Sequence, residues 1–301
     1  MKAIVFTKSG PPEVLTLQEI DKPAPKNDEI LVKIYAGTVA VADVKLRKIP
    51  KILQKIFFPL FGFGAKDIWG VEVAGQVEEV GKEVTLFRKG DRVFGTTTGQ
   101  STGGNAEYIC LPQRSKNQVV GRIPENLSFG EAAALPVGAM TALQLLRKAG
   151  AATGKKILIY GASGSVGTYA VQIARYLGAE VSGVCSTANL NLVRSLGASK
   201  AIDYTREDFT SNGETYDIIF DAVGKLPRGK WEKSLKKNGV HVSVSSPTKE
   251  TLEDLEYLIH LVETGALKPV IDQEFPLEHV PEAHRYVETG RKKGNVVITV
   301  S

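Results

Sequence analysis

The first third of the chain consists of short apolar runs that turn residues interrupt. Runs rich in β-branched and apolar residues predict strands, and Pro-Pro, Asn-Asp and Lys-Gly-Asp mark the turns between them. The segments with this pattern are KAIVFTK, EILVKIYA, EVAGQVEEVG, DRVFGTT and AEYICL. Residues 1–120 are therefore expected to form a β-rich domain.

The pattern changes near Gly121, after which strand-length apolar runs alternate with helical spacing. A helix is expected over EAAALPVGAMTALQLLRKAG, then strands at KILIY, EVSGVC, AIDY, DIIFDAV and VHVSV, and helices at VGTYAVQIARYLG, NLNLVRSLG and around WEKSLKKNG. Two of these helices end at glycines, Gly178 and Gly197, where a helix C-terminus favours positive φ. Apolar strands separated by helices predict a parallel, doubly wound sheet, so residues 121–265 are read as an α/β domain.

A last helix, TLEDLEYLIHLVETG, opens with the capping-box spacing of Thr251 and Asp254. From Lys268 the chain returns to strand character and ends in NVVITV. The chain contains no internal repeat and no low-complexity segment.

Composition narrows the class of protein. The 301 residues are 43% apolar, enough for two domains with a buried core. A net charge of +5 without an arginine-rich block favours anionic small ligands and makes no case for nucleic acid. Cys110 and Cys185 lie far apart and outside any CxxC or Cys/His cluster, so neither a disulfide framework nor a thiolate zinc knot is expected. Without a signal-peptide pattern or a membrane-length apolar run, a cytoplasmic enzyme is expected.

The segment YGASGSVGTYA, residues 160–170, joins an apolar strand to a helix. Dinucleotide-binding folds need a sharp turn here, so that backbone N–H groups and the helix N-terminus face a pyrophosphate. Against G-x-G-x-x-G, Ala162 replaces the first glycine, Gly164 and Gly167 match, and Gly161 adds freedom one residue earlier. The flanking strand and helix favour a dinucleotide site over a plain tight turn. The predicted contacts are Gly161, Ala162, Ser163, Gly164, Ser165, Val166 and Gly167.

The end of the following strand favours NADPH over NADH. NAD-binding proteins usually place Asp or Glu there to bind the ribose 2′-hydroxyl. Here the strand ends in Cys185, Ser186 and Thr187, so no carboxylate would repel a 2′-phosphate and two hydroxyls could donate to it. Tyr204, which ends the next strand, could stack or donate. The basic clamp is less clear, because ANLN follows the strand and Arg194 lies further along the helix.

Nearly the whole chain resembles the medium-chain dehydrogenases/reductases, in their zinc-free branch of quinone oxidoreductases and enone reductases. The similar segments are ILVKIYAGTVAVADVKLR, WGVEVAGQVEEVG, FRKGDRVFG, GGNAEYICLP, LSFGEAAALPVGAMTALQLL, the glycine loop, RSLGASKAIDY, YDIIFDAVG and LKPVIDQEFPLEHVPEAHRYVETGRKKGNVVI. The resemblance implies an α/β protein with a GroES-like β-rich catalytic domain over 1–120, a Rossmann NADP-binding domain over 121–265, and a segment, 266–301, that completes the first domain.

The same resemblance can be followed at the positions where zinc-dependent relatives bind their catalytic metal. These positions are occupied here by Ala40, Val71 and, approximately, Val137, none of which offers the N, S or O ligand that Zn²⁺ needs. The structural zinc lobe with its four cysteines is also missing. We therefore expect no metal.

Without zinc, the acceptor must already be electrophilic, as a quinone or an α,β-unsaturated carbonyl is. Reduction leaves negative charge on oxygen, which a donor must stabilise. Some similar enone reductases carry Lys where this chain has Lys45, two residues after Asp43, so Lys45 is the expected donor with Asp43 orienting it. The alternatives are a solvated Lys45, an Asp43 that caps a turn, and a water as donor. The family's Asn is replaced by Ala40.

The resemblance implies further contacts with the cofactor. One contact lies on a helix beside the nicotinamide, and others lie in the turn after the fourth Rossmann strand and at the end of the fifth strand. The last contacts lie in the loop before the final strand of the chain. These residues are Thr141, Ala222, Val223, Gly224, Ser243, Ser245, Gly294 and Asn295. Each could instead be a small residue required only by packing.

Two features depart from the family pattern. Only SSPTKET separates the strand VHVSV from the last helix, so the stretch that supplies a sixth Rossmann strand is absent, and formation of a homodimer is left open. The segment IPKILQKIFFPLFGFG, residues 49–64, is apolar and basic. It is interpreted either as an insertion over the cleft that forms an apolar substrate mouth, or as a weak contact with a membrane surface.

The leading hypothesis is an NADPH-dependent, zinc-free reductase of quinones or activated alkenes, acting on a small apolar electrophile. One alternative is a carbonyl or alcohol oxidoreductase that uses NAD(P). The other is an NADPH-binding redox sensor with little turnover, which Ala40 mildly favours.

Overall fold

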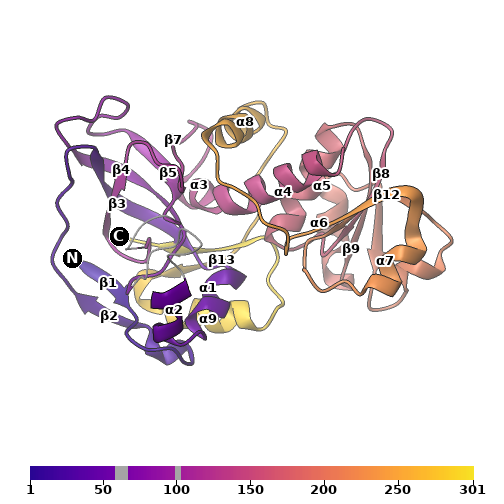
Figure 1. The fold of residues 1–301 in the computed structure, drawn as a ribbon, viewed down its shortest axis with the longest axis horizontal. Coiled ribbons are helices and arrows are strands. Elements are labelled where there is room, and N and C mark those ends of the chain that lie inside the picture. The colour runs from indigo at the N-terminus through magenta and orange to yellow at the C-terminus, as the bar shows by residue number, and fades with distance from the viewer. Residues whose placement is uncertain (58–66, 99–102) are drawn as a thin grey trace. The chain divides into compact units, whose positions relative to one another are not determined.

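The computed structural model describes residues 1–57, 67–98 and 103–301. It forms two compact units (Figure 1). The first unit is Met1–Val137, Glu250–Ile259 and Ile271–Ser301, and the second is Gly138–Lys249 and His260–Val270. Residues 121–137 fall in the first unit, and not in the second as the sequence pattern suggested, because α3 (Phe129–Ala134) packs on strands of the first unit's sheet.

The first unit is built around a seven-stranded sheet. Its strands are β3 (Glu29–Thr38), β4 (Glu72–Val80), β5 (Arg92–Thr96), β6 (Tyr108–Pro112), β7 (Val120–Arg122), β13 (Ile271–Pro276) and β14 (Asn295–Thr299). The order is β13-β14-β3-β4-β5-β7, with β6 also on β3. Because β14 pairs antiparallel with β3, the C-terminal segment shares a sheet with the N-terminal strands.

Short elements complete this unit. They are the strand pair β1 (Lys2–Val5) and β2 (Thr16–Glu19), the helices α1 (Val41–Arg47), α2 (Lys51–Phe57) and α9 (Val280–Glu288), and the 3₁₀ turns η1 (Pro12–Val14) and η5 (Leu277–His279). Helix α9 presents Val280, Ala283 and Val287 to the core at helical spacing. The core therefore receives side chains from both ends of the chain.

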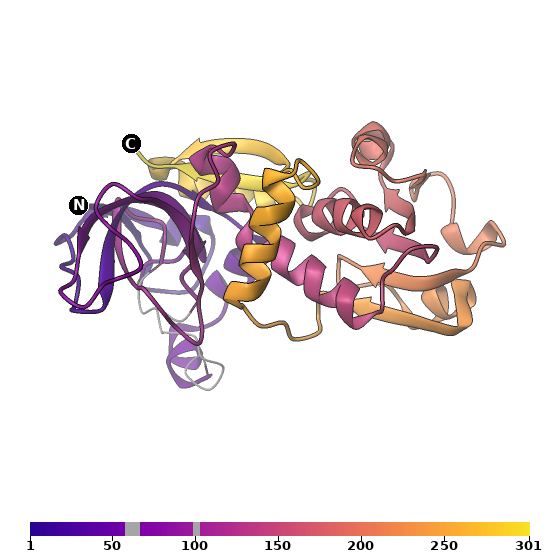
Figure 2. The ribbon, with the colours of Figure 1, turned by 90° about the horizontal axis from the view of Figure 1, so that it is seen from above.

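The second unit contains a five-stranded, wholly parallel sheet in the order β10-β9-β8-β11-β12. Its strands are β8 (Lys156–Tyr160), β9 (Glu180–Cys185), β10 (Lys200–Asp203), β11 (Tyr216–Asp221) and β12 (Leu235–Ser243). Its helices are α4 (Pro136–Lys148), which begins two residues before the unit does, α5 (Ser165–Tyr176), α6 (Leu190–Ser195) and α7 (Arg228–Ser234), with the 3₁₀ turns η3 (Thr187–Asn189) and η4 (Phe209–Ser211). Helix α5 lies on one side of this sheet and α7 on the other (Figure 2), so the predicted doubly wound α/β fold is confirmed.

The ends of several predicted elements are as expected. Gly178 and Gly197 follow their helices with φ of 79° and 109°. The Thr251 Oγ1 accepts from the Asp254 N–H at 3.2 Å, which caps α8 (Leu252–Glu263). The sheet of the second unit ends at β12, as the short segment after VHVSV implied.

Two expectations need correction. The single helix over EAAALPVGAMTALQLLRKAG is divided into α3 and α4 (Pro136–Lys148), because proline is accommodated in the first turn of a helix and not in its interior. Part of 49–64 is helical, as α2, and was not predicted to be so; residues 58–64 lie outside the described residues.

Candidate functional site

The glycine loop connects β8 to α5 through residues 161–164. Gly161 has φ of +82°, a conformation that side chains rarely tolerate. Its N–H and that of Ala162 both donate to the Val184 carbonyl, at 3.1 and 3.0 Å. The turn is thus fixed to the neighbouring strand β9.

Packing explains why the last position of the motif is glycine, Gly167, and why the first can be alanine, Ala162. A Cβ on Gly167 would lie 2.1 Å from the Gly161 carbonyl oxygen, so α5 can approach the turn only with glycine there. The Ala162 methyl is fully buried, and a Cβ on Gly183 of β9 would lie 2.9 Å from it. Gly183 therefore makes the room that the alanine of the motif occupies.

Gly164 is different, since nothing in the protein requires a glycine there. Its φ is −79°, and a Cβ would meet no atom closer than the Gly161 oxygen at 3.5 Å. Gly164 is the N-cap of α5, and the first N–H groups of a helix have no partner within the helix. The glycine keeps the space in front of these N–H groups open, as a bound phosphate requires.

Asn189, which the sequence analysis missed, links two predicted contacts. Its Nδ2 donates to Ser163 Oγ of the loop at 3.1 Å and to Ser186 Oγ at 3.3 Å. Both hydroxyls accept from Asn189 and keep their own protons for a ligand. The structure thus brings Ser163 and Ser186 together.

A carboxylate stands where the sequence pattern suggested none. The parallel register pairs Asp203 of β10 with Cys185 of β9, so the two strand ends lie side by side. Thr187 Oγ1 donates to Asp203, and the Thr205 N–H and Oγ1 donate to it at 3.0 and 2.7 Å. These hydrogen bonds lower the pKa of Asp203, so a negative charge lies beside the predicted 2′-phosphate contacts.

Tyr204 is 58% exposed and lines an open cavity of about 350 Å³. Two cations, Arg206 and Lys230, line the same cavity, and Lys230 pairs with Asp208 at 2.9 Å. Two acids, Glu207 and Asp208, line it as well, so the cavity places an aromatic ring and charges of both signs beyond the end of β10.

The carboxyl ends of β11 and β12 carry the remaining predicted contacts of the second unit. Asp221, missed by the sequence analysis, accepts from the N–H groups of Val223 and Gly224, each at 2.9 Å. The Val223 side chain lies over the glycine loop, because a Cβ on Gly161 would come within 2.5 Å of it. Ala222 precedes this turn, and its N–H donates to the Tyr160 carbonyl at 2.9 Å.

The serines after β12 lie against the same turn. A Cβ on Gly224 would lie 2.8 Å from Ser245 Oγ and 3.9 Å from Ser243 Oγ. Thr141 is half-buried on α4, three residues after Gly138, which contacts α5. The predicted contacts of this unit thus gather at the carboxyl edge of its sheet, where parallel sheets bind ligands.

In the first unit, Asp43 caps α1. Its buried carboxylate accepts from the Ala40 N–H at 2.7 Å. Lys45, two residues later, is exposed. Capping was the alternative to the orienting role expected for Asp43, and the structure shows capping.

Glu72 was not predicted, although it interrupts the buried apolar run WGVEVAG. It is 4% exposed, and its carboxylate accepts from Thr38 Oγ1 at 2.5 Å and from the Val137 N–H at 2.8 Å. Burial, reinforced by the charges of Asp43 and Glu250, raises the pKa of Glu72 to about 7. The first unit thus holds a carboxyl that changes charge near neutral pH.

The positions of the family's zinc ligands hold aliphatic side chains in this structure too. Val71 is buried, and Val137 uses its N–H to bind Glu72. Within residues 1–57, 67–98 and 103–301, no three His, Cys, Asp or Glu side chains gather as a metal site would need. The donor set around Ala40 and Val71 does not fit zinc.

The late loop belongs to the first unit. Gly294 has φ of +57°, and its carbonyl accepts from Lys292 Nζ at 2.6 Å. Burial lowers the pKa of Lys292 to about 8. Asn295, also buried, begins β14.

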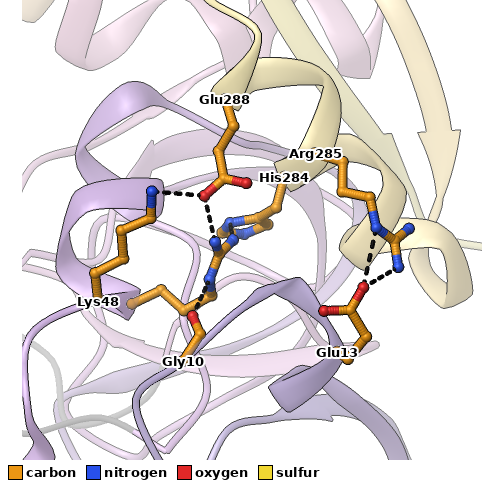
Figure 3. A network of polar contacts seen from close by, with 7 residues as sticks. Gly10, Glu13, Lys48, His284, Arg285 and Glu288 are labelled. Carbon is orange, nitrogen blue, oxygen red and sulfur yellow. Dashed lines mark hydrogen bonds and ion pairs between the residues drawn. The ribbon is translucent and has the colours of Figure 1, made fainter.

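Helix α1 is held in place by the fully buried Arg47. Its partners Gly10, His284 and Glu288 are labelled in Figure 3. Its Nε donates to the Gly10 carbonyl at 3.0 Å, and its Nη2 pairs with Glu288 at 2.5 Å. Nη1 lies 2.8 Å from His284 Nδ1, and because a guanidinium can only donate, this nitrogen must accept. Burial and the Arg47 charge lower the pKa of His284 to about 3, so the ring is neutral and α1 stays tied to α9.

Comparisons with known proteins agree with this geometry. Residues 26–125 match the family model described as an alcohol dehydrogenase GroES-like domain, and residues 230–298 match one described as a zinc-binding dehydrogenase. A 2-methylene-furan-3-one reductase from Solanum lycopersicum is 35% identical over 319 residues, covering 99% of this chain and 79% of the relative. An NADPH-dependent alkenal/one oxidoreductase, chloroplastic, from Arabidopsis thaliana is 31% identical with the same coverage.

A solved quinone oxidoreductase from Coxiella burnetii has the same fold, with a TM-score of 0.88, 30% identity and coverage of 100% of this chain and 99% of that chain. The matches to these relatives extend over both units of the chain. The chain belongs to the medium-chain dehydrogenase/reductase superfamily.

Proposed function

We propose that this chain is an NADPH-dependent oxidoreductase that reduces quinones or α,β-unsaturated carbonyls without a catalytic zinc. The observation that carries the proposal is Gly164, a glycine that neither backbone conformation nor packing requires, placed at the N-terminus of α5. A pyrophosphate is the kind of ligand that uses such an opening.

The second unit would hold the cofactor, which supplies a hydride when bound. The N–H groups at the start of α5 would bind its phosphates, and Ser163 and Ser186 would donate to its adenosine end. The charge of Asp203 weakens the preference for a 2′-phosphate. It also offsets part of the charge of Arg206, whose Nε lies 3.7 Å from Asp203 Oδ2, whereas Tyr204 favours that phosphate. The name of the Arabidopsis relative, which specifies NADPH, supports the choice of NADPH over NADH.

The first unit would stabilise the reduced acceptor. When hydride reaches a quinone or enone carbon, the conjugated oxygen gains negative charge. Lys45 is an exposed ammonium on a helix that Asp43 caps and Arg47 anchors, so it can donate to that oxygen from a fixed element. Water remains the alternative donor.

The donor set supports the zinc-free part of the proposal. Ala40, Val71 and Val137 cannot ligate a metal, so the acceptor must be activated by its own conjugation. The names of the relatives support this acceptor class, since they describe reductases of an enone, of alkenals and enones, and of quinones.

The test is the rate of NADPH oxidation with 1,4-benzoquinone, a 9,10-quinone, an enone and an enal, with a saturated aldehyde and NADH as controls. We expect turnover with at least one quinone or activated alkene, unaffected by a chelator. Turnover of the aldehyde alone would make the chain a carbonyl oxidoreductase. Tight NADPH binding without any turnover would indicate a redox sensor.

A further inference from the structure

Helix α2 has its polarity reversed relative to an ordinary surface helix. Ile52, Leu53 and Ile56 are 69%, 40% and 56% exposed. Gln54 is fully buried, and its Nε2 donates to the carbonyls of Leu46 and Ile49 at 3.0 and 2.8 Å. Surface helices normally bury their apolar side, so the outward apolar side of α2 needs a partner.

Positive charges outnumber negative ones around this surface. Among the side chains of residues 45–57 that the structure describes, Lys45, Arg47, Lys48 and Lys51 are basic and none is acidic, and Arg47 is fully buried. Lys45 and Lys48 are exposed. The acids that face this stretch from elsewhere are Glu288, which pairs with Lys48 at 2.9 Å, and Asp67, which pairs with Lys51 at 2.9 Å. The partner should therefore offer apolar volume beneath negative charge.

We propose that α2 docks on the surface of a lipid bilayer that carries anionic headgroups. A bilayer requires only shallow insertion of a few apolar side chains, such as these three, whereas a stable protein interface buries about 800 Å² per side. Ile52, Leu53 and Ile56 enter the boundary between headgroups and acyl chains, and the neighbouring lysines meet the phosphates. Within the described part of the chain, no helix is long and apolar enough to span a membrane.

This contact is weak and reversible, because one short helix inserts few apolar groups. It depends on salt, since screening shortens the range of the lysine charges. It places the protein where apolar electrophiles dissolve, but its detection does not require turnover.

The test is sedimentation of the full chain with vesicles of phosphatidylcholine alone or with about 30% phosphatidylserine. We expect binding to the anionic vesicles, several-fold weaker at 500 mM than at 50 mM salt. I52S/I56S should lower the partition coefficient about tenfold or more. The matched control is L17S/Y176S, which removes two exposed apolar side chains (41% and 47% exposed) elsewhere and should bind as wild type.

Several results would overturn the proposal. One is that all protein stays in the supernatant, and another is equal binding by I52S/I56S and wild type. Equal binding to neutral and anionic vesicles would remove the charge argument. A dimer in sedimentation equilibrium that I52S/I56S converts to monomer, without vesicle binding, would assign the surface to a second copy of the chain.

Discussion

The candidate site of the second unit consists of backbone groups, whereas that of the first unit consists of side chains. In the second unit, seven consecutive residues, Gly161 to Gly167, form the proposed phosphate site from backbone groups. In the first unit, the polar groups are side chains, such as Asp43, Glu72 and Glu250, that come from separate segments and influence one another through their charges. The backbone site has no room for a side chain at Gly161 or Gly167 but has room at Gly164, whereas the side-chain site depends on charge and burial. Substitutions should therefore affect the two sites through different quantities.

Among changes to the first unit's side chains, Arg47→Met should lower the free energy of unfolding the most. The change leaves Glu288 and the neutral His284 without their buried partner, and breaking a buried pair costs about 3–5 kcal/mol. Arg285→Met is the matched control, because Arg285 pairs with Glu13 at the surface (Figure 3) and exposed pairs contribute little. Urea unfolding measures both. Equal losses of stability in the two variants would show that the burial of Arg47 does not make it contribute more than the exposed Arg285.

Glu72→Gln tests, through the pH dependence of the free energy of unfolding, whether the buried carboxyl has a raised pKa. A carboxyl whose pKa is raised to about 7 binds protons more tightly in the folded protein, so the free energy of unfolding should fall as pH rises from about 4.5 to 7. Glutamine can still accept from Val137 and bond to Thr38. The variant should match wild type near pH 4 and exceed it by about 3 kcal/mol at pH 8. Parallel stability curves would mean that Glu72 titrates normally.

Gly164→Asp tests the backbone site without damaging the fold. Aspartate is a favourable N-cap, and the φ of −79° suits it, so the melting temperature should stay the same or rise. Its carboxylate would occupy the phosphate position, and NADPH affinity should fall about a hundredfold. Gly167→Ala is the contrasting variant: its Cβ clashes with Gly161, so it should lose stability. Titration of NADPH fluorescence measures the affinity of both variants. Unchanged affinity in Gly164→Asp would exclude a phosphate at the N-terminus of α5.

Lys45→Met should have the smallest effect. Losing one donor to a developing oxyanion should lower kcat about tenfold and leave NADPH affinity unchanged. Lys82→Met, at another exposed lysine of the same unit, should leave kcat unchanged. If both variants keep full kcat, water stabilises the reduced oxygen.

The same contrast explains what the sequence could predict. The glycine loop and its flanking strand and helix were readable because they are contiguous. Asp203 was not, because its place beside Thr187 depends on the register between β9 and β10. Glu72 left one signal, an acid within a buried strand. Arg47 left none, since its partners Gly10 and His284 are distant in the chain.

The end of the second unit's sheet at β12 has a consequence for storage and handling. The outer edge of this strand presents backbone N–H and C=O groups that no strand within residues 1–57, 67–98 and 103–301 covers. Lys236, which pairs with Asp217 at 2.8 Å, and Lys237 are exposed near its start, so another copy that aligned its own β12 there would bring the Lys237 charges together. Acetylation of these amines would remove the repulsion and should make concentrated solutions prone to edge-to-edge aggregation.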